Sequence, residues 1–207
     1  MYAGATSGIK FFRKVGVPLM TDAMVFARMF LKNPAMLGSA WPSSGSLCSH
    51  LMRLVDWSEA RYVVEYGPGV GTVTQHILRN LRSDGVLIAI EKNPELVTHL
   101  RSKFRSRDPR LKIVQGSAAD VRKILTQHGI GLGDCFVAGI PFSLLPPKEV
   151  QRILSSTRES LAPEGRLLIY QFSNAIEPAL KRNFKSVQRG REIRNFLPAR
   201  TYVASNS

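Results

Sequence analysis

Cysteine is scarce in this sequence: Cys48 and Cys135 are the two cysteines in 207 residues. They lie far apart and form no CxxC motif, which excludes the usual cysteine spacing of a zinc site or a redox pair. Free cysteines are among the most frequently buried residues. We therefore expect two buried thiols and no metal site.

Long uncharged apolar runs are also missing. A membrane-spanning helix needs about 18 to 20 consecutive apolar residues, and Asp22 and Arg28 interrupt the most apolar stretch, Val15–Leu31. The N-terminus lacks the small-residue cleavage site of a signal peptide. These absences predict a cytoplasmic protein without a spanning helix.

Acidic residues are few, with 15 Asp and Glu against 29 Lys and Arg, which gives a formal net charge of +14. This excess favours a polyanionic partner because phosphates attract Lys and Arg. Nucleic acid and an anionic membrane surface both meet that condition. The charge alone does not choose between them.

Apolar residues are abundant enough for a core, at 44% of the chain, and the length suits one domain with short additions. Residues 1–45 differ from the rest. After Thr21 or Asp22 they contain a Phe- and Met-rich helical pattern with basic flanks that ends before Pro34. This amphipathic segment suits either a membrane interface or the surface of the following domain.

Strand and helix patterns alternate through the middle of the chain. The expected strands are Arg61–Tyr66, Val86–Glu91, Lys112–Gln115, Cys135–Gly139 and Arg166–Phe172. The expected helices are Ser46–Val55, Thr72–Leu81, Pro94–Phe104, Ala119–Gln127 and Pro147–Leu161. The alternation predicts an α/β fold with a doubly wound, mostly parallel sheet. Two further strands, within 181–187 and 188–203, would form a strongly basic C-terminal hairpin at one edge and bring the sheet to seven strands.

The chain is organised around Val63–Thr72, where an apolar run ends in an acid and three alternating glycines follow. Glycine lets the backbone approach a ligand closely, so we interpret this stretch as a strand, a tight turn beneath a nucleotide, and a helix. Glu91, at the end of the second strand, is placed to accept hydrogen bonds from ribose hydroxyls. The turn fits neither the GxGxxG pattern nor the GK[ST] of a P-loop.

The pattern E-x-G-P-G-x-G-x-x-T at Glu65–Thr74 resembles motif I of the class I S-adenosylmethionine (SAM)-dependent methyltransferases. Ala89–Leu96 resembles the ribose-binding motif of that family, and Val114–Asp120 resembles its adenine-contacting motif with Ser117 in place of the usual Asp. The resemblance implies a Rossmann-like methyltransferase domain over residues 46–207, with 1–45 as a membrane-associating and cofactor-capping segment. It also implies that SAM is bound, and S-adenosylhomocysteine released, by Glu65, Tyr66, Gly67, Gly69, Gly71, Thr74, Glu91, Lys92, Ser117, Ala118, Ala119 and Gly139.

Two subfamilies share this motif I, the ribosomal RNA adenine N6-dimethyltransferases and the bacterial phospholipid N-methyltransferases. The RNA enzymes carry Asn-Leu/Ile-Pro-Tyr/Phe after the fourth strand, whereas this chain has Gly139-Ile140-Pro141-Phe142. Glycine removes the amide that would hold the amine of a flipped adenine, and the stretch resembles the phospholipid enzymes instead.

The resemblance makes Gly139, Ile140, Pro141 and Phe142 the catalytic loop, with Tyr66 beside it. Backbone carbonyls of this loop would orient the acceptor nitrogen. The aromatic candidates for cation-π contacts with a methylated ammonium are Tyr66, Phe142, Tyr170 and Phe172.

We therefore expect a peripheral enzyme on the inner face of the cytoplasmic membrane that methylates phosphatidylethanolamine, towards phosphatidylcholine. Anionic lipid would attract its basic residues and N-terminal helix. A nucleic-acid partner is not favoured, but RNA adenine N6-methylation is the alternative. A third interpretation is a cofactor-binding or membrane-remodelling module without turnover. The sequence fixes neither the oligomeric state nor the number of methyl groups added.

Overall fold

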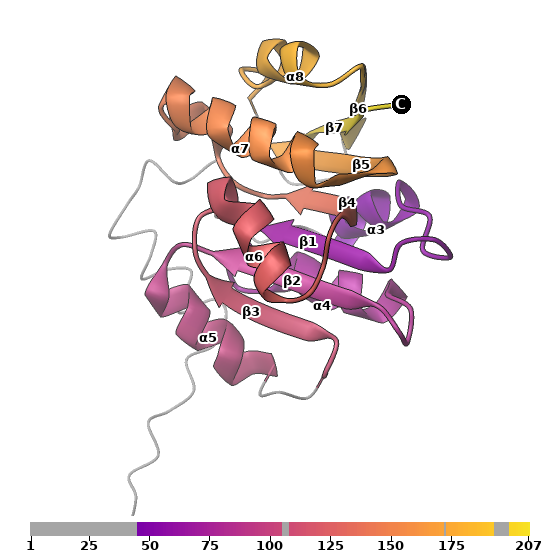
Figure 1. The fold of residues 1–207 in the computed structure, drawn as a ribbon, viewed down its shortest axis with the longest axis vertical. Coiled ribbons are helices and arrows are strands. Elements are labelled where there is room, and N and C mark those ends of the chain that lie inside the picture. Colours follow the sequence, from indigo (N-terminus) through magenta and orange to yellow (C-terminus); the bar gives the residue numbers. More distant parts are fainter. Residues whose placement is uncertain (1–44, 105–107, 172, 193–198) are drawn as a thin grey trace, which may run out of the picture.

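The computed structural model describes residues 45–104, 108–171, 173–192 and 199–207, in which helices cover both faces of a seven-stranded sheet (Figure 1). The strands are β1 (Tyr62–Tyr66), β2 (Val86–Glu91), β3 (Leu111–Gln115), β4 (Gly133–Ala138), β5 (Leu161–Gln171), β6 (Ser186–Glu192) and β7 (Ala199–Ser205). The helices are α3 (Gly45–Arg53), α4 (Thr72–Asn80), α5 (Pro94–Phe104), α6 (Val121–Gln127), α7 (Pro147–Ser160) and α8 (Glu177–Asn183), with short 3-10 helices η2 (Ala118–Asp120) and η3 (Phe142–Leu144). The predicted amphipathic helix lies outside the described residues.

The strand order is β3-β2-β1-β4-β5-β7-β6. The first five strands of this order are parallel, and β7 is antiparallel to both β5 and β6. The chain moves outward from β1 to β3 on one side and then crosses to β4, so the order reverses between β1 and β4. Ligands of open α/β sheets bind beyond the carboxyl ends of the strands at such a switch point. The predicted doubly wound, mostly parallel sheet with an edge hairpin is confirmed.

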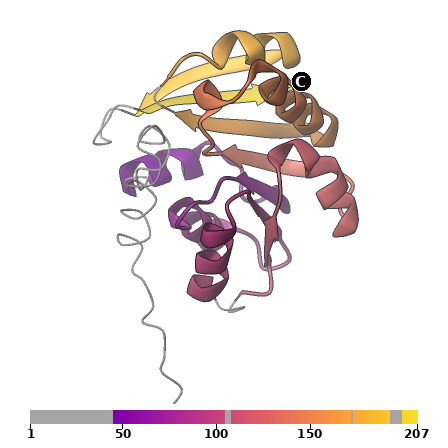
Figure 2. The ribbon, with the colours of Figure 1, turned by 90° about the vertical axis from the view of Figure 1, so that its left-hand side faces the viewer.

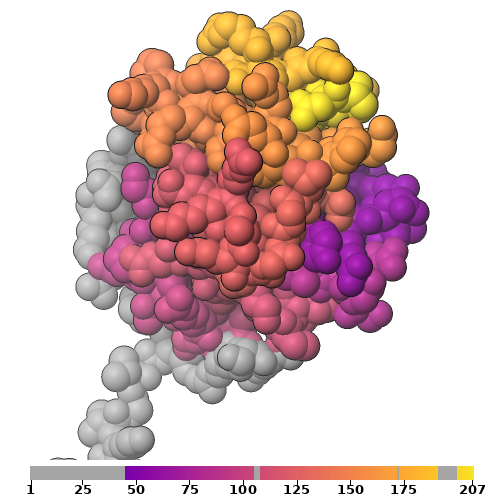
Figure 3. Space-filling model, viewed as in Figure 1, coloured from indigo at the N-terminus to yellow at the C-terminus, as the bar shows by residue number. Residues whose placement is uncertain are grey.

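Two apolar clusters hold helices against the two faces of the sheet. On one face, α6, α7 and α8 pack on side chains such as Val64, Tyr66 and Phe136. Figure 3 shows residues of α6 and α7 covering the centre of this face. On the other face, α3 and α4 pack on side chains such as Val63 and Val137, and Figure 2 shows the sheet from its side. Parallel strands covered on both faces are apolar throughout, so the buried acids Glu65 and Glu91 are exceptions.

Both cysteines are free and buried, as predicted. Burial raises the pKa of the Cys48 thiol to about 11 and that of the Cys135 thiol to about 12. Each thiol therefore stays protonated at neutral pH and packs as a small apolar side chain.

The C-terminal prediction was partly wrong. Residues Glu177–Asn183 form the helix α8, so the strand predicted within 181–187 begins only at Ser186. Proline in the first turn, with Lys181 and Arg182 in the last turn, was the available helix signal. The positive charge expected here is also offset locally, because Lys181 and Arg189 pair with Glu177 at 3.0 and 3.5 Å.

The boundary between α7 and β5 also differs from the prediction. The helix ends at Ser160 and the strand begins at Leu161, so Pro163 and Gly165 lie within β5 instead of between two elements. Within the described ranges, no helix is both long enough and apolar enough to cross a membrane.

Candidate active site

The three glycines of the turn after β1 all have positive φ, at 66°, 59° and 81° for Gly67, Gly69 and Gly71. A Cβ on Gly67 would lie 2.7 Å from Ile140 Cγ2, and one on Gly71 would lie 2.8 Å from Phe104 Cε2. A Cβ on Gly69 would meet no atom of the described residues within 4 Å. Gly67 and Gly71 are therefore required by packing, whereas Gly69 leaves open space that a ligand can fill.

Glu91 joins this turn to the end of β2. Its Oε2 accepts a hydrogen bond from the Gly69 amide at 3.2 Å, and its Oε1 accepts one from the Asn93 amide at 2.9 Å. The side chain is buried, and burial raises the pKa of its carboxyl. The carboxylate thus lies beside the open space at Gly69, and its contact with a ribose stays a prediction. Lys92, the next residue, is exposed.

Glu65 is a second buried carboxyl at the carboxyl end of the sheet, with 1% of its surface exposed. Its Oε2 accepts a hydrogen bond from the Thr74 hydroxyl at 2.6 Å. Its Oε1 is buried and has no hydrogen-bond partner in the described part of the chain. Burial raises the pKa of this carboxyl to about 8, and the Glu91 charge adds to the rise. An unsatisfied buried acceptor fits a cationic ligand group, such as the amino group of SAM.

Replacing Glu65 with glutamine is expected to flatten the pH dependence of stability. The carboxyl titrates near 4.5 when unfolded and near 8 when folded. Between these values the folded state binds more protons than the unfolded state, so wild-type stability falls as pH rises. The amide oxygen of E65Q can still accept the hydrogen bond from Thr74. The amide does not titrate, so position 65 of the variant releases no proton as the pH rises. Chemical denaturation across this window checks the prediction, and parallel curves for both proteins would contradict it.

The same variant is expected to bind SAM about ten-fold more weakly, because its amide nitrogen would take the place of Oε1 and cannot accept from the cofactor ammonium, and a hydrogen bond to a charged group is worth roughly 1.5 to 3 kcal/mol. Titration calorimetry with SAM measures this change. If E65Q is more stable than wild type at alkaline pH and also binds SAM more weakly, the carboxyl lowers stability at alkaline pH and contributes to cofactor binding.

The side chain of Ser117, in the predicted adenine-contacting segment, makes hydrogen bonds within the protein. Ser117 Oγ accepts a hydrogen bond from the Ala119 amide at 3.2 Å and caps η2. The same hydroxyl donates to Glu149 Oε1 at 3.3 Å. Ala118 is buried at 9% exposure. A contact between these residues and adenine stays a prediction.

The loop after β4 is held against the glycine turn. The Gly139 amide donates to the Tyr66 carbonyl at 3.0 Å, and the Ile140 side chain occupies the space beside Gly67. A Cβ on Gly139 would lie 2.6 Å from Tyr170 Cζ and still closer to the phenolic oxygen. The phenol of Tyr170 therefore occupies the place that a side chain at position 139 would take.

The predicted aromatic residues differ in what they can reach. Tyr66 is 0% exposed, and its hydroxyl lies 2.9 Å from the Thr157 hydroxyl of α7. Phe142 is 3% exposed and packs in the same cluster. This packing disfavours the predicted catalytic contact of the Tyr66 ring, because the ring faces the core. Phe172 lies outside the described residues, and Tyr170 is the partly exposed ring beside Gly139.

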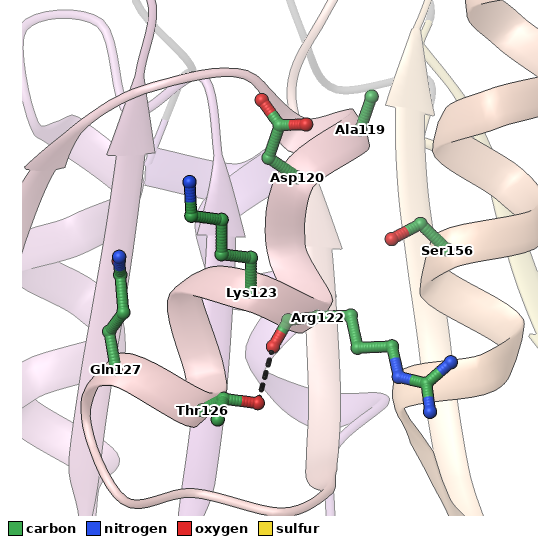
Figure 4. A pocket seen from close by; sticks show the side chains of 7 residues that line it. All are labelled: Ala119, Asp120, Arg122, Lys123, Thr126, Gln127 and Ser156. Carbon is green, nitrogen blue, oxygen red and sulfur yellow. Dashed lines mark hydrogen bonds between the residues drawn. The ribbon is translucent and has the colours of Figure 1, made fainter.

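A shallow pocket of about 550 Å³, open to solvent, lies on the outer side of α6 and α7 (Figure 4). It is lined by Ala119, Asp120, Arg122, Lys123, Thr126, Gln127 and Ser156. Arg122 extends from α6 towards α7, where it pairs with Glu159 at 3.3 Å. The pocket shares Ala119 and Asp120 with the predicted adenine-contacting segment Val114–Asp120 but includes none of the glycine turn, so we do not assign it to the active site.

Comparison with known proteins identifies methyltransferase relatives. The sequence model of a family described as "Methyltransferase domain" matches residues 63–165. An ornithine lipid N-methyltransferase from Singulisphaera acidiphila is 33% identical over 185 residues, which cover 88% of this chain and 95% of that protein. A ribosomal RNA small subunit methyltransferase A from Parasynechococcus marenigrum is 26% identical over 53% of this chain and 35% of that protein.

Among solved structures, an O-methyltransferase from Bacillus cereus in complex with SAH superposes with a TM-score of 0.64. The alignment covers 91% of this chain and 94% of that one at 15% identity. At this identity the likeness concerns the fold.

Proposed function

The chain belongs to the class I SAM-dependent methyltransferases, and on that basis we propose that it transfers methyl groups to the amine of a membrane lipid. SAM supplies an electrophilic methyl group on a sulfonium. We propose that Gly69 gives the cofactor room, that Glu91 holds its ribose, and that Glu65 accepts from its amino group. Of these, the open space at Gly69 and the unsatisfied Oε1 of Glu65 are the features that fit the cofactor.

The acceptor side of the site must align a neutral amine and exclude water. An alkyl amine with a pKa near about 10.4 is mostly protonated at neutral pH, so desolvation in the site has to favour the neutral form. The loop Gly139–Phe142 suits this task because Phe142 anchors it in the core and Ile140 packs on the turn. The Ile140 and Pro141 carbonyls accept from the Phe142 and Leu144 amides at 3.0 and 2.9 Å, which keeps the loop compact.

The observation that carries the choice of acceptor is the packing of Gly139. The RNA enzymes that this chain resembles place an asparagine at this position, and here the Tyr170 side chain would have to move to admit one. The relationship to an ornithine lipid N-methyltransferase over most of both chains also supports a lipid acceptor. We propose phosphatidylethanolamine as the acceptor, with further transfers towards phosphatidylcholine. The amine of an ornithine lipid is the second candidate. We further propose that the protein works as a peripheral enzyme on the inner face of the cytoplasmic membrane.

The test is transfer of labelled methyl groups from SAM to separated acceptors. Purified full-length protein is incubated with phosphatidylethanolamine, with ornithine lipid and with ribosomal RNA, and the products are identified by mass spectrometry. We expect methylated lipid and no methylated RNA. Labelled RNA with unlabelled lipid would overturn the proposal, and methylation of ornithine lipid alone would reassign the acceptor. Production of SAH without any of these products would point to a different substrate.

A further inference from the structure

Two large apolar side chains are conspicuously exposed in the described part of the chain. They are Leu144, at 52% exposure, and Leu132, at 43%. Leu144 belongs to η3 and follows β4, whereas Leu132 immediately precedes β4. Because β4 has six residues and spans roughly 20 Å at about 3.3 Å per residue, the two leucines lie beyond opposite ends of this strand.

The backbone around Leu144 fixes its exposure. Its amide donates to the Pro141 carbonyl at 2.9 Å, and the Leu145 amide donates to the Phe142 carbonyl at 3.2 Å. Phe142, at 3% exposure, anchors this turn in the core. A buried ring on one side of a one-turn helix leaves Leu144 on the other side, so the exposure is built into the loop.

The neighbouring surface is suited to anionic lipid. Pro146 and Pro147 are exposed and follow directly, and the exposed Lys148 comes next at the start of α7. Lys92 is exposed at the carboxyl end of β2, at the same end of the sheet. The positive charge of Arg152 is offset by ion pairs with Glu149 and Asp120 at 3.4 and 3.8 Å. The surface therefore offers an apolar tip next to Lys148, with Lys92 at the same end of the sheet, within a chain of formal net charge +14.

We infer that the tip formed by Leu144, Pro146 and Pro147 docks on an anionic phospholipid bilayer, with Leu144 entering the acyl boundary and Lys148 facing the phosphates. This inference rests on the proposed lipid function, because the same loop carries Gly139–Phe142. Docking by the loop would bring the headgroup amines to the side of the sheet where the parallel strands end (Figure 1). The catalytic loop and the membrane contact are then one short segment.

The test compares Leu144→Gln with the matched control Leu132→Gln in the full-length protein. Sedimentation with vesicles of phosphatidylethanolamine and phosphatidylglycerol should show L144Q bound about five-fold more weakly than wild type, from the lost apolar burial. L132Q should bind as wild type does. The ratio of methylation in vesicles to methylation in detergent-dispersed lipid should fall for L144Q only. Equal vesicle binding by L144Q and wild type, or an equal loss in L132Q, would overturn the inference.

A second measurement places the tip directly. Both native thiols are buried, at 0% and 2% exposure, so a cysteine at position 144 or 132 can be labelled selectively with an environment-sensitive fluorophore. The label on L144C should shift to shorter wavelength with anionic vesicles, and the label on L132C should not. This readout needs no turnover, so a protein that inserts at position 144 but methylates no lipid would contradict the proposed function and keep the docking surface. No shift at 144, or equal shifts at both positions, would refute docking by this loop.

Discussion

Replacing Gly139 with alanine is expected to lower kcat/KM for methyl transfer by about 100-fold, the loss that follows when reacting groups are misplaced by about 1 Å. The added Cβ would meet the Tyr170 ring at 2.6 Å from Cζ, so the ring or the loop has to move. Overpacking of this kind also costs about 1 to 3 kcal/mol of stability. Steady-state kinetics and chemical denaturation measure the two effects.

The control for G139A is Gly131→Ala, because a Cβ on Gly131 would meet none of the residues that the structure describes within 4 Å. G131A should retain wild-type activity and stability. The double variant G139A/Y170A tests the cause: with the ring removed, G139A should cost less free energy of unfolding than it does alone, by about 0.5 to 3 kcal/mol. An equal cost in both backgrounds would show that Tyr170 is not what position 139 packs against.

Replacing Gly69 with alanine is expected to weaken SAM binding by roughly 100-fold, because a methyl group would enter the space left for the cofactor and overpacking costs about 1 to 3 kcal/mol. The folded protein itself should tolerate the change, since within the described part of the chain no atom lies within 4 Å of the new Cβ. The remaining cost is the strain of an L-residue at φ 59°, which is about 1 to 2 kcal/mol.

Gly129 provides the matched control for that strain. It has φ 71° and open space at its Cβ position, but it lies between α6 and β4, away from the turn. G129A should therefore lose about the same stability, roughly 1 to 2 kcal/mol, and bind SAM as wild type does. Titration calorimetry and thermal melting of both variants decide the matter. If G69A binds SAM as tightly as wild type does, the cofactor does not occupy the space next to Gly69.

The architecture could be predicted from the sequence because its signals are local. β2 and α5 have the predicted bounds, since a run of apolar residues identifies the strand and Pro94 fixes the first turn of the helix. α8 was missed because seven residues are too few to display a helical period. The start of β5 was missed because Pro163 and Gly165 are usual terminators of elements, and tertiary pairing of Leu161 with Gly133 overrides them here.

The candidate site was predictable in position but not in the roles of its residues. Three alternating glycines predict a turn under a ligand, but only tertiary contacts separate Gly69, which faces open space, from Gly67 and Gly71, which face side chains. Likewise, the sequence places Tyr66 and Tyr170 at the ends of strands and does not say which face each ring takes. The structure puts Tyr66 against α7 and Tyr170 beside Gly139.

The position of β7 has a consequence for folding. β5 pairs on one side with β4, which precedes it, and on the other side with β7, which follows it in the sequence only after β6. One edge of β5 therefore stays unpaired until β7 has been inserted between β5 and β6. An unpaired edge of this kind can pair with other chains, so a folding intermediate without β7 would expose β5 to aggregation. Once β7 has paired, β6 forms that edge of the sheet.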